Sequence, residues 1–113
     1  MSESTVHSCD VIDLLAGAAV PAEGRRVETL AKTDAFELKR LSLAKGAAIP
    51  EHHAPGAITV QCLVGRVAFT AGGTTHDLRA GSLIHLAPRE PHALVGEEDS
   101  VVLVTKLAAP AGS

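Results

Sequence analysis

The chain has almost no aromatic side chains. Of its 113 residues none is tryptophan or tyrosine, and the only phenylalanines are Phe36 and Phe69. Proteins that bind single-stranded nucleic acid stack the bases on aromatic side chains, and this chain has too few for such a surface. Its net charge of −3 comes with no basic cluster that would neutralise phosphates. We therefore expect no nucleic-acid partner.

Long apolar runs and cysteine pairs are missing as well. The apolar run at residues 11–15 is short and interrupted by an aspartate, whereas a membrane-spanning helix needs about 20 apolar residues. The first residues, Met-Ser-Glu-Ser, lack the basic and then apolar order of a secretory signal. Cys9 and Cys62 form no CxxC motif, and we interpret both as free thiols. These absences predict a cytoplasmic protein with no membrane partner.

What the chain has is a series of short, alternating apolar stretches rich in Val, Leu, Ile and Ala. The strongest turn signal is Gly72-Gly73, because both residues can adopt a positive φ. For residues 10–15 a strand or an irregular arm fits the pattern better than a short helix. The expected strands are 27–30, 36–43, 57–64, 66–70, 74–78, 82–86, 92–95 and 101–107. Such a pattern, with little helix, predicts a β-sandwich or barrel.

The length fits one domain, which buries roughly two-thirds of the surface of the unfolded chain. Within it we expect an N-terminal arm with the first strand or strands at residues 1–33. A barrel is expected at 34–107 and a C-terminal tail at 108–113.

Two histidine-bearing stretches lie far apart along the chain. The first contains the adjacent His52 and His53, and the second ends at His92. A strand–turn–strand pattern separates them, so folding of a small barrel can bring the distant imidazoles to one cavity. Any chemistry of this protein is expected at that cavity.

With both stretches placed, the chain resembles the cupin superfamily of small, RmlC-like barrels. Gly46, His52 and Gly65 match the first Gly, the first His and the last Gly of the first cupin motif. Gly81 and His92 match the two ends of the second motif. The resemblance implies an all-β double-stranded β-helix, the cupin jelly-roll barrel, with an N-terminal arm. It also implies a homodimer.

The chain departs from the family pattern at several positions. The second His of the first motif is replaced by Ala54, and its Glu by Ile58. In the second motif Arg89 stands where the family has Gly. Of the four usual metal ligands, only His52 and His92 therefore carry over. The resemblance implies the fold without the usual site of three histidines and one glutamate.

A divalent metal (Fe, Ni, Zn or Mn) is one interpretation of the histidines, because neutral imidazole binds such ions. His52, His53 and His92 are the candidate ligands, and Gln61 would add an oxygen if it faces inward. Adjacent residues of a regular strand point to opposite faces, so including His53 requires a bend in the backbone. The alternative is a polar pocket without metal. The sequence leaves both open.

Two charged residues flank the candidate site. Glu51 is the nearest candidate acid or base, with a solvated turn carboxylate as the alternative. Arg89, at the expected pocket rim, can grip a substrate carboxylate, or it can simply be solvated.

The expected function is that of a small cupin with a histidine-lined pocket, which acts on or senses a small polar metabolite. An enzyme of this kind would be a metal-dependent dioxygenase, lyase or isomerase. The alternatives are a non-catalytic binding module and a structural dimer without a metal site. Residues 57–64 and 101–104 are apolar on both faces, which also favours a homodimer because one small barrel cannot cover both.

Overall fold

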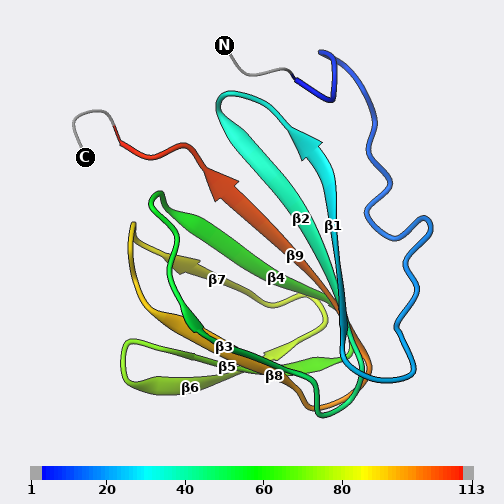
Figure 1. Ribbon diagram of the computed structural model, residues 1–113, viewed down its shortest axis with the longest axis vertical. Helices are drawn as coiled ribbons and strands as arrows, with labels where there is room; N and C mark the ends of the chain where they lie inside the picture. Colours follow the sequence, from blue (N-terminus) through cyan, green and yellow to red (C-terminus); the bar gives the residue numbers. More distant parts are fainter. Residues whose placement is uncertain (1–3, 111–113) are drawn as a thin grey trace.

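Two antiparallel β-sheets form the protein, as the computed structural model shows for residues 4–110 (Figure 1). The strands are β1 (Arg25–Lys32), β2 (Phe36–Leu43), β3 (Ala48–His52), β4 (Ile58–Val64), β5 (Arg66–Ala71), β6 (Thr74–Arg79), β7 (Leu83–Leu86), β8 (His92–Gly96) and β9 (Ser100–Leu107). The first sheet has the order β1-β2-β9-β4-β7, and the second has the order β3-β8-β5-β6. Residues 4–110 contain no helix, and hence none that could span a membrane. The predicted all-β jelly roll is confirmed.

Alternation of apolar and polar residues directs one face of each sheet into the core. In β4, Ile58 and Val60 are buried, whereas Gln61 beside them is only partly buried. Phe69 in β5 has the largest fully buried side chain of the described residues and faces them from the second sheet. Because side chains in a strand alternate with a period of two, the apolar set of each strand lies on one side. The core therefore sits between the two sheets.

The sequence predicted eight strands, and the structure adds a ninth, β3. The omission has a physical reason, because Pro50 lies within β3 and proline cannot donate a ladder hydrogen bond. As an edge strand, β3 pairs only with β8, and such a position tolerates proline. The ladder between β3 and β8 shifts register between Ile49 and His52.

Glycine is required at two corners of the fold. Gly72 and Gly73 have φ of 61° and 75°, which confirms the predicted turn between β5 and β6. Gly65, between β4 and β5, has φ of 84°, and a Cβ there would collide with the backbone oxygen of Asp99. A side chain at Gly65 would be strained in the backbone and would have no space.

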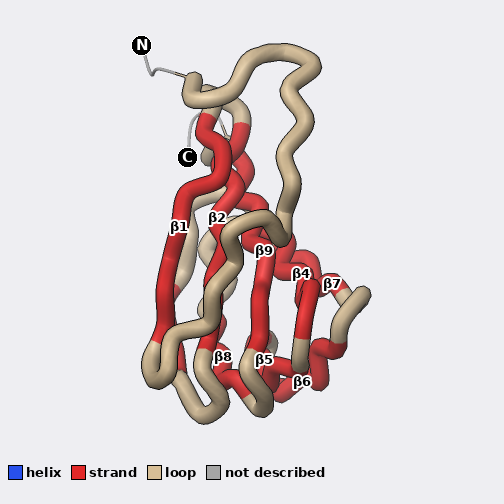
Figure 2. Tube along the Cα trace, turned by 90° about the vertical axis from the view of Figure 1, so that its right-hand side faces the viewer, coloured by secondary structure: helices blue, strands red, loops and turns tan. Residues whose placement is uncertain are grey.

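An irregular arm precedes β1 and runs along the outer face of the first sheet (Figure 2). Arg40 on β2 anchors it, because its guanidinium donates to the backbone oxygens of Leu14 and Ala16 at 3.2 and 2.7 Å. The same guanidinium pairs with Glu28 on β1 at 2.9 Å. Arg40 is only 3% exposed, so its guanidinium is shielded from water, whereas the side chain of Glu28 is 24% exposed. Residues 10–15, within the arm, form neither a helix nor a strand.

The outer face of β9 is buried within a single chain. Leu103 lies opposite Arg40 in the β2–β9 ladder, so both share the face on which the arm runs, and Leu103 is buried. The sequence assigned the two-sided apolar character of residues 101–104 to a dimer contact. In the structure the chain itself covers this part of the sheet.

Candidate functional site

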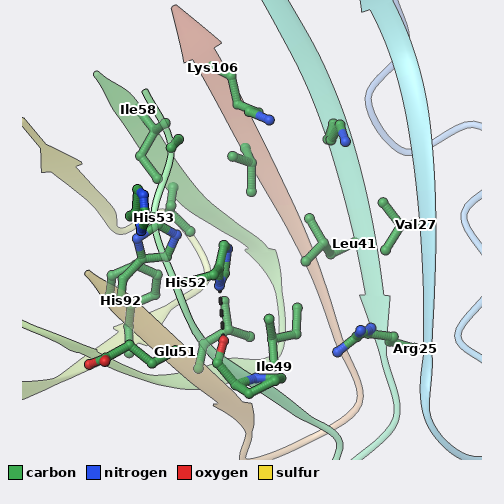
Figure 3. Close-up of a pocket in the computed structure, with 17 residues that line it drawn as sticks. Arg25, Val27, Leu41, Ile49, Glu51, His52, His53, Ile58, His92 and Lys106 are labelled. Carbon is green, nitrogen blue, oxygen red and sulfur yellow. Dashed lines mark hydrogen bonds between the residues drawn. The ribbon is translucent and has the colours of Figure 1, made fainter. Parts of the chain in front are cut away.

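A cavity of about 380 Å³ lies between the two sheets (Figure 3). Its size is within the roughly 300–1,000 Å³ of small-molecule sites. About half of the lining residues are aliphatic, and they come from both sheets, among them Val27, Leu41, Ile58, Val60, Leu94 and Val104. Polar and charged side chains make up most of the rest, and such groups orient a ligand in a pocket that apolar side chains enclose.

His52 and His92 meet at this cavity as a cross-strand pair. His52 ends β3 and lies directly opposite His92, the first residue of β8. The ring centroids are 4.1 Å apart, and the ring planes are inclined by 61°. Both residues line the cavity. The structure therefore brings the two distant histidine stretches together at one place.

Backbone carbonyl groups fix the orientation of both rings. Nδ1 of His52 lies 3.0 Å from the backbone oxygen of Pro50, and Nδ1 of His92 lies 2.9 Å from that of Glu90. A carbonyl oxygen can only accept a hydrogen bond, so Nδ1 is the donor in each ring. In the neutral ring Nε2 then has no hydrogen and presents a lone pair. Each ring can accept a hydrogen bond or a proton, or bind a metal, through Nε2.

His92 is held in an apolar environment that favours its neutral form. Its ring is stacked on Phe69 with centroids 5.7 Å apart and planes inclined by 12°, and the residue is 4% exposed. This burial lowers the pKa of His92, and the nearby His52 and His53 lower it further, while the hydrogen bond to the Glu90 backbone opposes the shift. His92 therefore stays neutral, with Nε2 unprotonated, down to a lower pH than an exposed histidine.

His53 and Glu51 also line the cavity. Adjacent residues such as His52 and His53 would point to opposite faces in a regular strand, but β3 ends at His52 and the alternation ends with it. In Figure 3 the Glu51 carboxylate points away from the three histidines. The structure thus gathers three imidazoles at the cavity, without the carboxylate of Glu51 beside them.

Two of the residues singled out from the sequence lie elsewhere. Ile58 and Val60 of β4 line the cavity. Because successive side chains of a strand point to opposite faces, Gln61 points to the other face of the sheet, away from the histidines. Arg89 is exposed and is not among the residues that line the cavity. Its φ is 65°, and its backbone N–H donates to the oxygen of Ala54 at 2.8 Å. Neither Gln61 nor Arg89 is among the residues that line the cavity.

Three cations that the sequence analysis did not single out line the cavity from the first sheet. They are Arg25 on β1, Lys39 on β2 and Lys106 on β9. A signal for two of them was present in the sequence. Lys39 lies two residues before the inward-facing Leu41, and Lys106 lies two residues after the inward-facing Val104. Strand alternation alone therefore places both lysines on the cavity side.

The histidines fit a metal ion only in part. Nε2 of His52 and of His92 have the tautomer that metal binding needs, because each Nδ1–H is donated to a backbone carbonyl. Within residues 4–110, however, no group of three or more His, Cys, Asp or Glu is arranged to hold a metal ion. Catalytic zinc sites commonly use three protein ligands. The geometry therefore supplies two ligands of such a site.

Several solved structures share this fold. A conserved protein of unknown function from Streptococcus pyogenes is 26% identical, with a TM-score of 0.81 and 98% of each chain covered. A cupin superfamily protein from Desulfitobacterium hafniense is 18% identical, with a TM-score of 0.77, covering 91% of this chain and 94% of the other. An RmlC-like cupin from Shewanella frigidimarina is 18% identical, with a TM-score of 0.72 and coverage of 78% and 79%.

The search of curated proteins found no match to this chain. The family described as "Cupin domain" matches residues 39–106. This range is more than half of the 113 residues and contains both histidine stretches, the edge strand β3 and most of the cavity wall. The fold, the histidine pair and the sequence match agree, and the chain belongs to the cupin family.

Proposed function

We propose that this cupin binds a small polar metabolite in the cavity between its sheets, and that His52 and His92 contact the ligand through Nε2. The observation that carries the proposal is the pair of Nδ1–H bonds to backbone carbonyls, which leaves two lone pairs at one cavity. A neutral imidazole in this position accepts a hydrogen bond from a ligand hydroxyl or amide. The same contact can accept a proton, so it would also suit a general base.

The second candidate is a divalent metal (Fe, Ni, Zn or Mn) held by His52 and His92, with His53 as a third ligand. The favouring observation is again the Nδ1–H bonds, since metal-binding histidines almost always donate their other ring N–H to such a partner. When bound, a metal would polarise a ligand oxygen. The lack of a grouped third ligand among the described residues makes this the weaker candidate.

Phenylalanine substitutions of the histidines test the binding proposal. We expect His52→Phe and His92→Phe to weaken the binding of small metabolites about tenfold, because a phenyl ring has no nitrogen lone pair to accept a hydrogen bond from the ligand. The matched control is His85→Phe, on β7, whose exposed side chain does not line the cavity. Thermal-shift screening of chelator-treated protein finds the ligands, and calorimetry measures their affinities. Equal affinities in all three variants and the wild type would contradict the proposal.

Metal titration separates the two candidates. If the metal candidate holds, calorimetry detects binding of Fe, Ni, Zn or Mn to the wild type and its loss in both His52→Phe and His92→Phe. Metabolites would then stabilise only the metal-loaded protein. If they stabilise the chelator-treated protein equally well, the pocket works without metal.

We also propose that the chain forms a homodimer in the cytoplasm. Apolar side chains that remain exposed in a single chain support the dimer: Val64, Leu83, Val95 and Leu107 are 40–53% exposed. The two free thiols, Cys9 and Cys62, support a reducing compartment. Light scattering at micromolar concentration is expected to give twice the mass of the chain, and a monomer there would contradict the dimer.

A further inference from the structure

We infer that the cavity selects small hydroxyl-bearing organic anions. Lys39 and Lys106 would bind the anionic group, and His52 and His92 would accept hydrogen bonds from the hydroxyl of the same molecule. This inference rests on the proposed binding function and names the class of ligand. It is argued from the positive charge of the cavity wall, an observation that is separate from the histidine pair.

Positive charge gathers in the cavity of a chain that is negative as a whole. Arg25, Lys39 and Lys106 line it from neighbouring strands of the first sheet, while the net charge of the chain is −3. Glu51 is the only carboxylate among the lining residues, and in Figure 3 it points away from the histidines. A cleft with one sign of charge and apolar walls concentrates ions of the opposite sign.

Two of the cations have partners of their own. Arg25 donates to the backbone oxygen of Ala48 at 3.3 Å. Nζ of Lys106 lies 3.9 Å from the Glu37 carboxylate, which is too long for a hydrogen bond. The carboxylate of Glu37 thus neutralises part of the charge of Lys106 without occupying its N–H donors.

Lys39 is the cation whose charge is least compensated. It is partly buried on the inward face of β2, next to the apolar Leu41 and Val104 that line the same cavity. No ion pair or side-chain hydrogen bond joins its ammonium group to any of the residues 4–110. A partly buried ammonium group among aliphatic side chains is stabilised by a counter-ion. An anion in the cavity would provide that counter-ion.

The two walls of the cavity are therefore complementary to different chemical groups of one ligand. The first sheet offers N–H donors with positive charge, and the second offers the lone pairs of His52 and His92. Aliphatic side chains line the cavity as well. A short hydroxycarboxylate, or a phosphate monoester with a free hydroxyl, meets all three conditions. Both ligands share the same chemistry, an organic anion with a hydroxyl group.

Three matched ligand series distinguish the possibilities. The probes are straight-chain ω-hydroxycarboxylates, the phosphate monoesters of the corresponding diols, and the uncharged ω-hydroxyamides of the same lengths. Methyl NMR signals of Ile49 and Ile58, which line the cavity, report binding to chelator-treated protein. We expect at least one anionic series to bind and the hydroxyamides to bind at least about tenfold more weakly, as for the loss of a hydrogen bond to a charged group. The tighter of the two anionic series identifies the anionic group.

Lysine variants test the assignment to Lys39 and Lys106. Lys39→Met and Lys106→Met are expected to weaken anion binding at least about tenfold, and Lys39→Arg is expected to retain it. Lys45→Met is the matched control, because Lys45 is exposed in the turn between β2 and β3 and does not line the cavity. Thermal melting confirms that each variant is folded, and the two methionine variants provide independent tests.

Other binding results would contradict either the anion inference alone or the proposed binding function as well. If hydroxyamides bind as tightly as the acids, or if both methionine variants bind anions like the wild type, the anion inference is wrong while the binding function stands. If no compound of any series shifts the methyl signals at millimolar concentration, and metabolite screening finds no ligand, both proposals are wrong.

Discussion

The two cysteines lie in very different surroundings. Cys9 is exposed in the arm, whereas Cys62 is buried in β4. The Cys62 thiol points to the backbone oxygens of Val64 and Gly65 at 3.4 and 3.5 Å. Burial raises the pKa of this thiol, and the hydrogen bond to Val64 only partly offsets the effect. The reactive thiolate is thus disfavoured at Cys62, and reagents cannot reach it.

We predict that a thiol reagent at mildly alkaline pH modifies Cys9 as fast as it modifies an exposed cysteine in a peptide, and leaves Cys62 unmodified in the folded protein. Because the pKa of Cys62 is raised, its thiolate fraction is low at a pH where an exposed cysteine reacts. Mass spectrometry after peptide digestion measures both sites. In the Cys9→Ser variant, labelling should appear only with denaturant. Rapid labelling of that variant without denaturant would show that β4 opens locally.

At the level of single residues, the sequence predicted part of the site. His52 and His92 were singled out from their motif positions, and the structure brings them together at the cavity. Gln61 was weighed without knowing which face of its strand is inward, although the apolar Ile58 and Val60 carry that information. Lys39 was overlooked because a charged residue at an inward position is unusual. The orientation of the rings depends on backbone carbonyls, which no sequence motif encodes.

At the level of elements, Arg40 joins three parts of the chain: β2, β1 and the arm. It is 3% exposed, and its partners are the Glu28 carboxylate and the backbone oxygens of Leu14 and Ala16. Substituting one member of a buried polar network leaves the others unsatisfied, which costs more than the interaction contributes. The arm has no helix or strand of its own, so it depends on such contacts.

We predict that Arg40→Met lowers the free energy of unfolding by about 2–4 kcal/mol and releases residues 10–20 from the sheet. Denaturant titration measures the first effect, and increased hydrogen exchange in the arm measures the second. The matched control is Arg26→Met, since Arg26 pairs with the same Glu28 at 3.2 Å but is half exposed. It should cost at most about 1 kcal/mol, as exposed ion pairs do. An equal cost for both variants would contradict the anchoring role of Arg40.

The elements were predicted well where alternation is regular and poorly where it is interrupted. Eight of the nine strands were expected near their observed positions because apolar and polar residues alternate along them. The edge strand β3 was missed because Pro50 and the register shift after Ile49 conceal it. The path of the arm could not be predicted, since it is fixed by hydrogen bonds from one side chain, Arg40, rather than by a repeating pattern.

For the whole molecule, composition and alternation were sufficient to predict two packed sheets, and the spacing of the histidine stretches was sufficient to predict the family. The predicted dimer had two supports, and one of them has changed. The outward side of residues 101–104 is covered within one chain, where Leu103 is only 7% exposed. The exposed residues that remain, among them Leu83 on β7 and Val95 on β8, lie on different sheets. A dimer contact through Leu83 would therefore use a different surface of the protein from a contact through Val95.

Lys39 and Arg40 are consecutive residues of β2, one facing the cavity and the other facing the arm. A single peptide unit thus separates the charge proposed to bind the anion from the anchor of the arm. If docking of the arm shifts β2 and thereby changes the affinity of the cavity for an anion, thermodynamic linkage requires a reciprocal effect. Binding of the anion then changes the stability of the docked arm by the same coupling free energy. The N-terminal segment and the interior of the barrel would then respond to each other through one shared backbone.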